Sequence, residues 1–211
     1  MKGLPRPLSQ CELSFLEEVK IYNQVLEFTM IISQNQGGIE TNARGERGVK
    51  IFTRQTITAL SLSRILPNPN PLITSDSDLW DINSIASLTR NLIEGYLSQY
   101  YFGLEKISEL EAELRFFILQ LHRNIEWFNI RDIEDPIEYK EFKEGIDQQK
   151  RRIKNHPYLK ELSITNKNRA LKFNEIYKTK SDFENELPVC KKKIKNYRLL
   201  SNLVHPLPLS I

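Results

Sequence analysis

Apolar residues recur at steps of three and four along most of the chain, a spacing typical of amphipathic helices. The first such stretch runs from Ser9 to Gln36, and its stripe is made up of Leu13, Leu16, Val19, Asn23, Leu26 and Met30. Ser9 is followed three residues later by Glu12, a pairing that predicts a capping box. These signals predict a long first helix that packs through one face.

Three further helices are expected in the first two thirds of the chain, over about 49–66, from Asp81 or Ser84 onward, and over about 104–129. The stretch between the second and third helices, 67–78, contains three prolines. Proline removes a backbone donor and restricts the residue before it, so this stretch is not helical.

Glycine-containing stretches mark two breaks between these helices. The segment "GIETNARGERG", residues 38–48, is interpreted as an exposed loop before the second helix. Gly103 is interpreted as a break or kink between the third and fourth helices.

The sequence becomes more charged and less regular at about residues 133–188. A charged helix is expected over 139–155, a polar stretch over 163–188, and a short last helix over 191–204. No alternation of apolar and polar residues persists over the length of a strand. We therefore expect an all-α fold, an up-and-down helical bundle that forms a single domain over 1–211.

Composition is that of a globular protein and excludes few functions. The chain has 211 residues, of which 40% are hydrophobic and 27% charged, with a net charge of +3. This charge neither requires nor excludes an anionic partner. Cys11 and Cys190 have no metal-ligand spacing, and no apolar run has the length of a signal peptide core or a membrane span. We expect a cytoplasmic protein without a membrane contact, a metal or a cofactor.

Several enzyme signatures are missing from the sequence. It has no glycine-rich phosphate loop, no metal-binding cluster and no nucleophile elbow. The chain has three histidines, His122, His156 and His205. His156 precedes a proline in a charged stretch and is expected to be exposed. His122 and His205 are therefore the better candidates for acid–base chemistry.

The last predicted helix gathers polar side chains on one face. Tyr197, Ser201 and His205 follow one another at steps of four and so lie within an arc of ~80°. Arg198 precedes His205 by seven residues, almost two turns, and Asn202 lies in the same stretch. Histidine moves protons near neutral pH and arginine matches phosphate oxygens, so the pair suits phosphodiester cleavage or binding. The alternative is a helix end whose tyrosine and histidine bond locally while the arginine is solvated.

A second set of polar residues occurs in apolar surroundings on the third and fourth helices. Arg115 and His122 have the same seven-residue separation, and Arg90 and Glu94 are spaced for an ion pair within one helix. If all four point inward, they form a polar network in the core. A structural role is expected for this network. The alternative is a small-molecule or nucleotide pocket lined by Arg90, Glu94 and His122.

Three segments resemble, in their order, a group of uncharacterised bacterial helical proteins in the HEPN superfamily (higher eukaryotes and prokaryotes nucleotide-binding). The segments are "RNLIEGYLSQYYF", "ELEAELRFFILQLHRNIEW" and "YRLLSNLVHPLP". The resemblance covers roughly residues 80–207. It rests on an arginine and a glutamate on one helix, a glutamate-rich start leading to an arginine on the next, and the ending Tyr-x3-Ser-x3-His-Pro.

The resemblance implies a helical bundle that is often dimeric and frequently tied to defence or toxin–antitoxin systems. Active HEPN proteins are metal-independent ribonucleases with an arginine a few residues before a histidine. Carried over, Arg198 stabilises charge on the scissile phosphate and His205 is the general acid or base. The implied partners are RNA, a second copy of the chain and an antitoxin-type protein.

Two departures from the pattern keep a second function open. Active members usually have a polar residue after the arginine, where this chain has Leu199, and relatives continue into another helix beyond the histidine. This predicts either a fragment or an active face that lacks a wall. The alternative function is a non-catalytic helical interaction or dimerisation domain, so whether the protein is an enzyme stays open.

Overall fold

All regular secondary structure is helical in the residues that the computed structural model describes, which are 9–37, 39–66, 81–174, 176–187, 197, 199–201 and 203–204. For these residues the all-α prediction is confirmed. None of the helices formed by them is long and apolar enough to cross a membrane.

Side-chain caps set where the first helices begin. α1 (Gln10–Gln34) starts after Ser9, whose hydroxyl accepts the Glu12 N–H while the Glu12 carboxylate accepts the Ser9 N–H. The predicted capping box is therefore present. α3 (Ile82–Gln99) starts after Asp81, one of its two expected starts, because the Asp81 carboxylate accepts the Ser84 N–H.

The second helix begins earlier than the sequence predicted. α2 (Ala43–Ile65) starts inside the stretch 38–48 that was interpreted as a loop. The reason is Asn42, whose side chain accepts the N–H of Gly45 at 2.8 Å and so caps the helix. The prediction of a loop over this whole stretch was wrong.

Close contacts between residues divide the chain into two compact units. The first takes the described parts of 1–103 and 192–211, and the second those of 104–191. The prediction of one domain stays a prediction.

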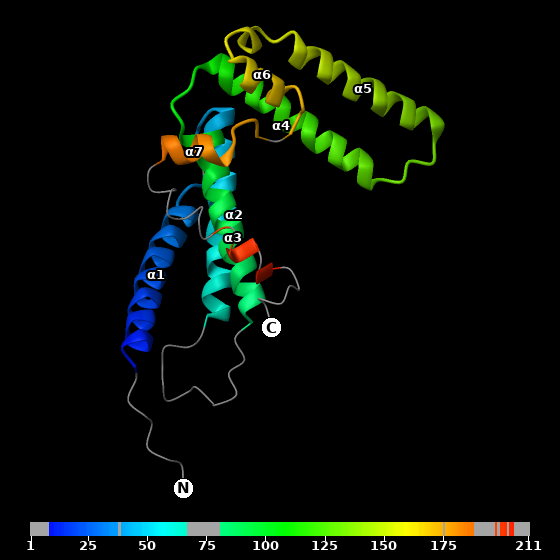
Figure 1. Cartoon of the computed structure of the whole chain (residues 1–211). Helices are drawn as coiled ribbons and strands as arrows, with labels where there is room; N and C mark the ends of the chain where they lie inside the picture. Colours follow the sequence, from blue (N-terminus) through cyan, green and yellow to red (C-terminus); the bar gives the residue numbers. More distant parts are fainter. Residues whose placement is uncertain are drawn as a thin grey trace. The chain divides into compact units, whose positions relative to one another are not determined.

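In the first unit, α2 contacts both α1 and α3 (Figure 1). The Tyr22 hydroxyl donates to the Ala59 carbonyl at 2.7 Å, and Ser63 bonds Asn23 at 2.8 Å. Ser33, near the end of α1, bonds Thr53, which lies earlier in α2 than Ala59 and Ser63, so the two helices run antiparallel. The buried apolar residues of the three helices are Val19, Leu26, Leu62, Ala86 and Leu97.

A π-helical turn, Tyr100–Leu104, follows α3 directly. It contains Gly103, so the predicted break at this residue is confirmed. A Cβ placed on Gly103 would lie 3.2 Å from the Cα of Gly48 on α2. Glycine at both positions therefore lets the two backbones approach closely.

In the second unit, α4 (Glu109–Ile130) and α5 (Pro136–Lys154) form an antiparallel pair (Figure 1). The Asn124 amide donates to Gln149 at 3.0 Å, and the ring of Phe128 stacks on Phe142 at 5.2 Å between centroids. The buried apolar residues of this unit include Leu114, Ile118, Leu121, Ile153 and Leu159.

The segment after α5 is made of short helical pieces. They are η2 (Pro157–Lys160), α6 (Ile164–Ala170) and α7 (Lys180–Glu186). Tyr177 and Phe183 of this segment are buried. Short elements with local caps satisfy the backbone of a stretch whose sequence has no helical period, which is why periodicity did not find them.

Candidate functional site

The residues predicted to carry catalysis lie at the end of the chain. Arg198, Asn202 and His205 are outside the described residues. Tyr197 and Ser201 are described. They are helical, and so are the other described residues of this stretch, 199–200 and 203–204. The expected last helix is therefore confirmed for the described part of 197–204.

Tyr197 joins this last helix to α3. Its hydroxyl donates to Glu94 Oε1, and the same oxygen accepts from Arg90 Nε at 3.1 Å. The guanidinium carbon of Arg90 also lies 5.0 Å from the centroid of the Tyr197 ring, which is within cation–π range. We call these three residues the α3 cluster. The predicted Arg90–Glu94 ion pair is confirmed.

The α3 cluster is open to solvent and carries charge at neutral pH. The side chains of Arg90 and Glu94 are 31% and 44% exposed. Burial, together with the hydrogen bond to Glu94, raises the pKa of the Tyr197 phenol, so the hydroxyl stays a donor. Burial would lower the pKa of Arg90, but the bond to Glu94 outweighs it and the pKa is raised. A polar ligand can therefore reach a fixed arginine here.

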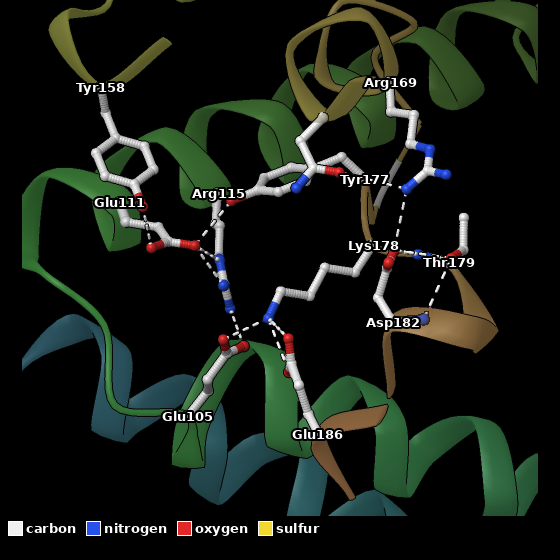
Figure 2. Close-up of polar contacts among 11 residues, drawn as sticks. Glu105, Glu111, Arg115, Tyr158, Arg169, Tyr177, Lys178, Thr179, Asp182 and Glu186 are labelled. Carbon is white, nitrogen blue, oxygen red and sulfur yellow. Dashed lines mark hydrogen bonds and ion pairs between the residues drawn. The ribbon is translucent and has the colours of Figure 1, made fainter. Parts of the chain in front are cut away.

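Arg115 is the centre of a second polar cluster, in the second unit (Figure 2). Its side chain is 1% exposed and lies among apolar residues of α4. Arg115 Nε donates to Glu111 Oε1 at 3.0 Å, and Nη1 donates to Glu105 Oε2 at 2.7 Å. Each carboxylate is thus paired with the buried guanidinium, as a buried charge requires.

Two tyrosines also form hydrogen bonds with Glu111. The Tyr158 hydroxyl donates to its Oε2, and the Tyr177 hydroxyl donates to its Oε1 at 2.8 Å (Figure 2). Lys178 bonds Glu105 and also Glu186, at 2.7 Å and 2.8 Å to the two oxygens of the latter. The members of this set, which we call the α4 cluster, are Glu105, Glu111, Arg115, Tyr158, Tyr177, Lys178 and Glu186.

Burial and hydrogen bonds shift the pKa of Glu111 and of its two tyrosine partners. Burial would raise the pKa of the Glu111 carboxyl, but the Tyr158 hydrogen bond and the Arg115 charge outweigh it and hold the pKa below its ordinary value. Burial raises the pKa of both Tyr158 and Tyr177. A Glu111 carboxylate held as an anion and two phenols held as donors are typical of a structural network.

A further ion pair joins the two short helices beside this cluster. Arg169 Nη1 lies 3.0 Å from Asp182 Oδ2 (Figure 2). The same carboxylate accepts the backbone N–H and the hydroxyl of Thr179, which forms a capping box at the start of α7. The contact therefore fixes α6 against α7.

The four residues predicted to form one internal network do not lie together: three belong to two separate clusters and His122 to neither. In the first unit Arg90 bonds Glu94, which accepts from Tyr197, whereas Arg115 bonds carboxylates of the second unit. His122 is half-buried on α4, and no hydrogen bond joins it to any part of the chain that the structure describes.

His156 is buried, 6% exposed, so the prediction that it is exposed was wrong. Its Nδ1 accepts the N–H of Tyr158 at 3.2 Å, because Pro157 starts a short helical turn that needs a cap. Its ring meets Phe117 edge-on at 5.8 Å between centroids. Nε2 lies 3.5 Å from Glu113 Oε2 and forms no hydrogen bond within the part of the chain that the structure describes, so the imidazole has a structural role as a cap.

A cavity of about 360 Å³ lies between α4 and α5 and is lined in part by Asn124, Glu138, Glu141 and Phe142. Its two carboxylates oppose the binding of a phosphate. Within the described ranges no three His, Cys, Asp or Glu side chains are grouped so that they could hold a metal ion.

Comparison with protein families, curated proteins and solved structures finds no match for the chain. The site is therefore interpreted from its own residues. Sequence reasoning found the two arginines and Glu94, but missed the acceptors and donors that surround Arg115. The spacing of Glu111 four residues before Arg115 was a usable signal, since a buried arginine needs a carboxylate within reach.

Proposed function

We propose that the protein is a HEPN-like, metal-independent ribonuclease of the cytoplasm that acts in stress or phage defence. The observation that supports this is the hydrogen bond between Tyr197 and Glu94. It joins two of the segments on which the resemblance rests, although 103 residues separate them in the chain. The contact anchors the helix of Tyr197, next to Arg198 in sequence, on an α3 face that carries Arg90.

In this proposal His205 and Arg198 act on the RNA backbone. The 2′-hydroxyl attacks the phosphorus, the 5′-oxygen leaves, and His205 takes or supplies the proton that these steps exchange. Arg198 stabilises the charge that develops on the phosphate oxygens. Neither step requires a metal ion, so cleavage should persist in EDTA.

The test is RNA cleavage by the purified chain in EDTA. His205→Ala should lower the rate by about 10²–10⁴-fold, the usual contribution of a general acid or base, without changing the melting temperature. His122→Ala is the matched control, because His122 also follows an arginine by seven residues on a helix. It should cleave like the unmodified chain.

Two results contradict the ribonuclease proposal. One is RNA left intact by the unmodified protein. The other is a His205→Ala variant that lowers the melting temperature and loses no more activity than the control variant.

A second function is a non-catalytic helical interaction domain, bound to a second copy or to an antitoxin-type protein. It is favoured by a separate observation on α1. Four apolar side chains of this helix, Ile21, Val25, Phe28 and Ile32, are exposed rather than packed against α2. A helix of a soluble protein seldom carries an apolar row on its outer side without a partner.

A further inference from the structure

Helix α1 has apolar residues on two sides. Val19 and Leu26 are buried on the side that packs on α2. At ~100° per residue, the row of Ile21, Val25, Phe28 and Ile32 lies about 140° around the helix from this pair, within an arc of ~60°. Val25 and Phe28 are 57% and 69% exposed. We call this row the outer row.

The contact of α1 with α2 includes several hydrogen bonds. Tyr22 bonds the Ala59 carbonyl, Ser33 bonds Thr53 at 3.3 Å, and Ser63 bonds Asn23. Beside these bonds Val19 and Leu26 are buried on this side, whereas the four apolar residues of the outer row lie on the other side of the helix. The helix therefore offers its partner an apolar surface that the first unit does not use.

The spacing of the outer row is the same when read in either direction. Its steps are four, three and four residues, the pattern of a short coiled-coil seam. When two copies of the helix lie antiparallel about a two-fold axis between Val25 and Phe28, Ile21 faces Ile32 and Val25 faces Phe28. Such a self-complementary row is what an isologous dimer needs.

Charge at the ends of the row selects the antiparallel orientation. Glu17 and Glu18 precede the row, and uncharged Asn35 follows it. In a parallel pair Glu18 would face Glu18 of the other copy, which is repulsive. In the antiparallel pair Glu18 faces Asn35, whose side-chain amide donates one N–H to the Ile31 carbonyl and has a second N–H that can donate to the carboxylate.

We propose that the outer row of α1 is the interface of a homodimer, in which the two α1 helices pack antiparallel. The inference deepens the second function above and rests on it. It does not depend on RNA cleavage. The contact is short, about three turns, so the dimer should be weak and should dissociate on dilution.

The test compares molar masses by sedimentation equilibrium at roughly 10–300 µM, a range suited to a small interface. The unmodified chain should reach the mass of two copies, and Val25→Glu should stay at one copy over the whole range with an unchanged circular dichroism spectrum. Ile137→Glu is the control, because Ile137 on α5 is 69% exposed, as Phe28 is. It should associate like the unmodified chain.

Orientation is tested by disulfide formation in a background with Cys11→Ser and Cys190→Ser. A mixture of Val25→Cys and Phe28→Cys chains should cross-link, because facing Cα atoms lie within the ~7 Å that a disulfide spans. Each variant alone should cross-link far less. Strong cross-linking of Val25→Cys alone would indicate a parallel pair and overturn the proposal.

The sedimentation experiment distinguishes a wrong interface from a protein that does not dimerise. If the unmodified chain is dimeric and Val25→Glu remains so, dimerisation stands but α1 is not its interface. If the unmodified chain is monomeric at every concentration, both dimerisation and the proposed interface are wrong.

Discussion

The α4 cluster and the α3 cluster are built from the same parts and differ in their exposure. Each has an arginine and a glutamate four residues apart on one helix, and a tyrosine from a distant segment that donates to that glutamate. Arg115 is 1% exposed and its two carboxylate partners 12% each, whereas Arg90 is 31% exposed. Burial makes the first a part of the core and leaves the second accessible.

This difference predicts opposite responses to the same substitution. Arg115→Leu leaves the Glu111 carboxylate without its cation and leaves Glu105 paired with Lys178, so we expect a loss of about 3–5 kcal/mol in the free energy of unfolding. Arg90→Leu breaks a half-exposed pair and should cost about 0–1 kcal/mol. Urea unfolding followed by circular dichroism measures both. Equal losses for the two variants would remove the distinction between the clusters.

A smaller effect is expected from pH. Because the folded-state pKa of Glu111 is lowered, its contribution to stability is complete above the unfolded-state value of about 4.3 and is lost as the pH falls through the folded-state value. Glu111→Gln removes this pH-dependent contribution to stability. The variant should therefore be less stable than the unmodified chain at pH 7 and should lose less stability between about pH 5 and pH 3. If the free energies of unfolding of the two proteins fall equally over that interval, the lowered pKa of Glu111 is contradicted.

Removing a single hydroxyl should cost less than removing the Arg115 charge. Tyr158→Phe and Tyr177→Phe each remove a hydrogen bond to the charged Glu111, which is only 12% exposed, and should cost about 1.5–3 kcal/mol. Tyr197→Phe removes the same kind of bond at an exposed site and should cost within about 0.5 kcal/mol. Thermal unfolding of the three variants under one set of conditions ranks them. A Tyr197→Phe loss as large as the other two would show that the α3 cluster is also part of a core.

Local signals in the sequence predicted much of the fold. The caps at Ser9 and Asp81 and the pair of Arg90 with Glu94 depend on residues within four positions of each other, so spacing alone found them. The start of α2 was missed because the cap at Asn42 lies in a stretch that also contains glycines.

Contacts between distant segments could not be predicted in the same way. An arginine in an apolar run indicated that Arg115 needs partners, but Tyr177 and Lys178 approach Glu111 and Glu105 from 66 and 73 residues away. Periodicity gives the face on which a residue lies and not the segment that covers it. The outer row of α1 can be found in the sequence by its spacing. It was missed because the stripe on the opposite side was enough to predict the helix.

The sequence separation of Glu94 and Tyr197 also orders events during synthesis. Glu94 leaves the ribosome 103 residues before its partner, and the whole second unit is translated in between. At roughly 5–20 residues per second this interval lasts on the order of 5–20 s. The α4 cluster lies entirely within 105–186 and can close during that time. The nascent chain therefore completes its buried cluster first and its exposed cluster last.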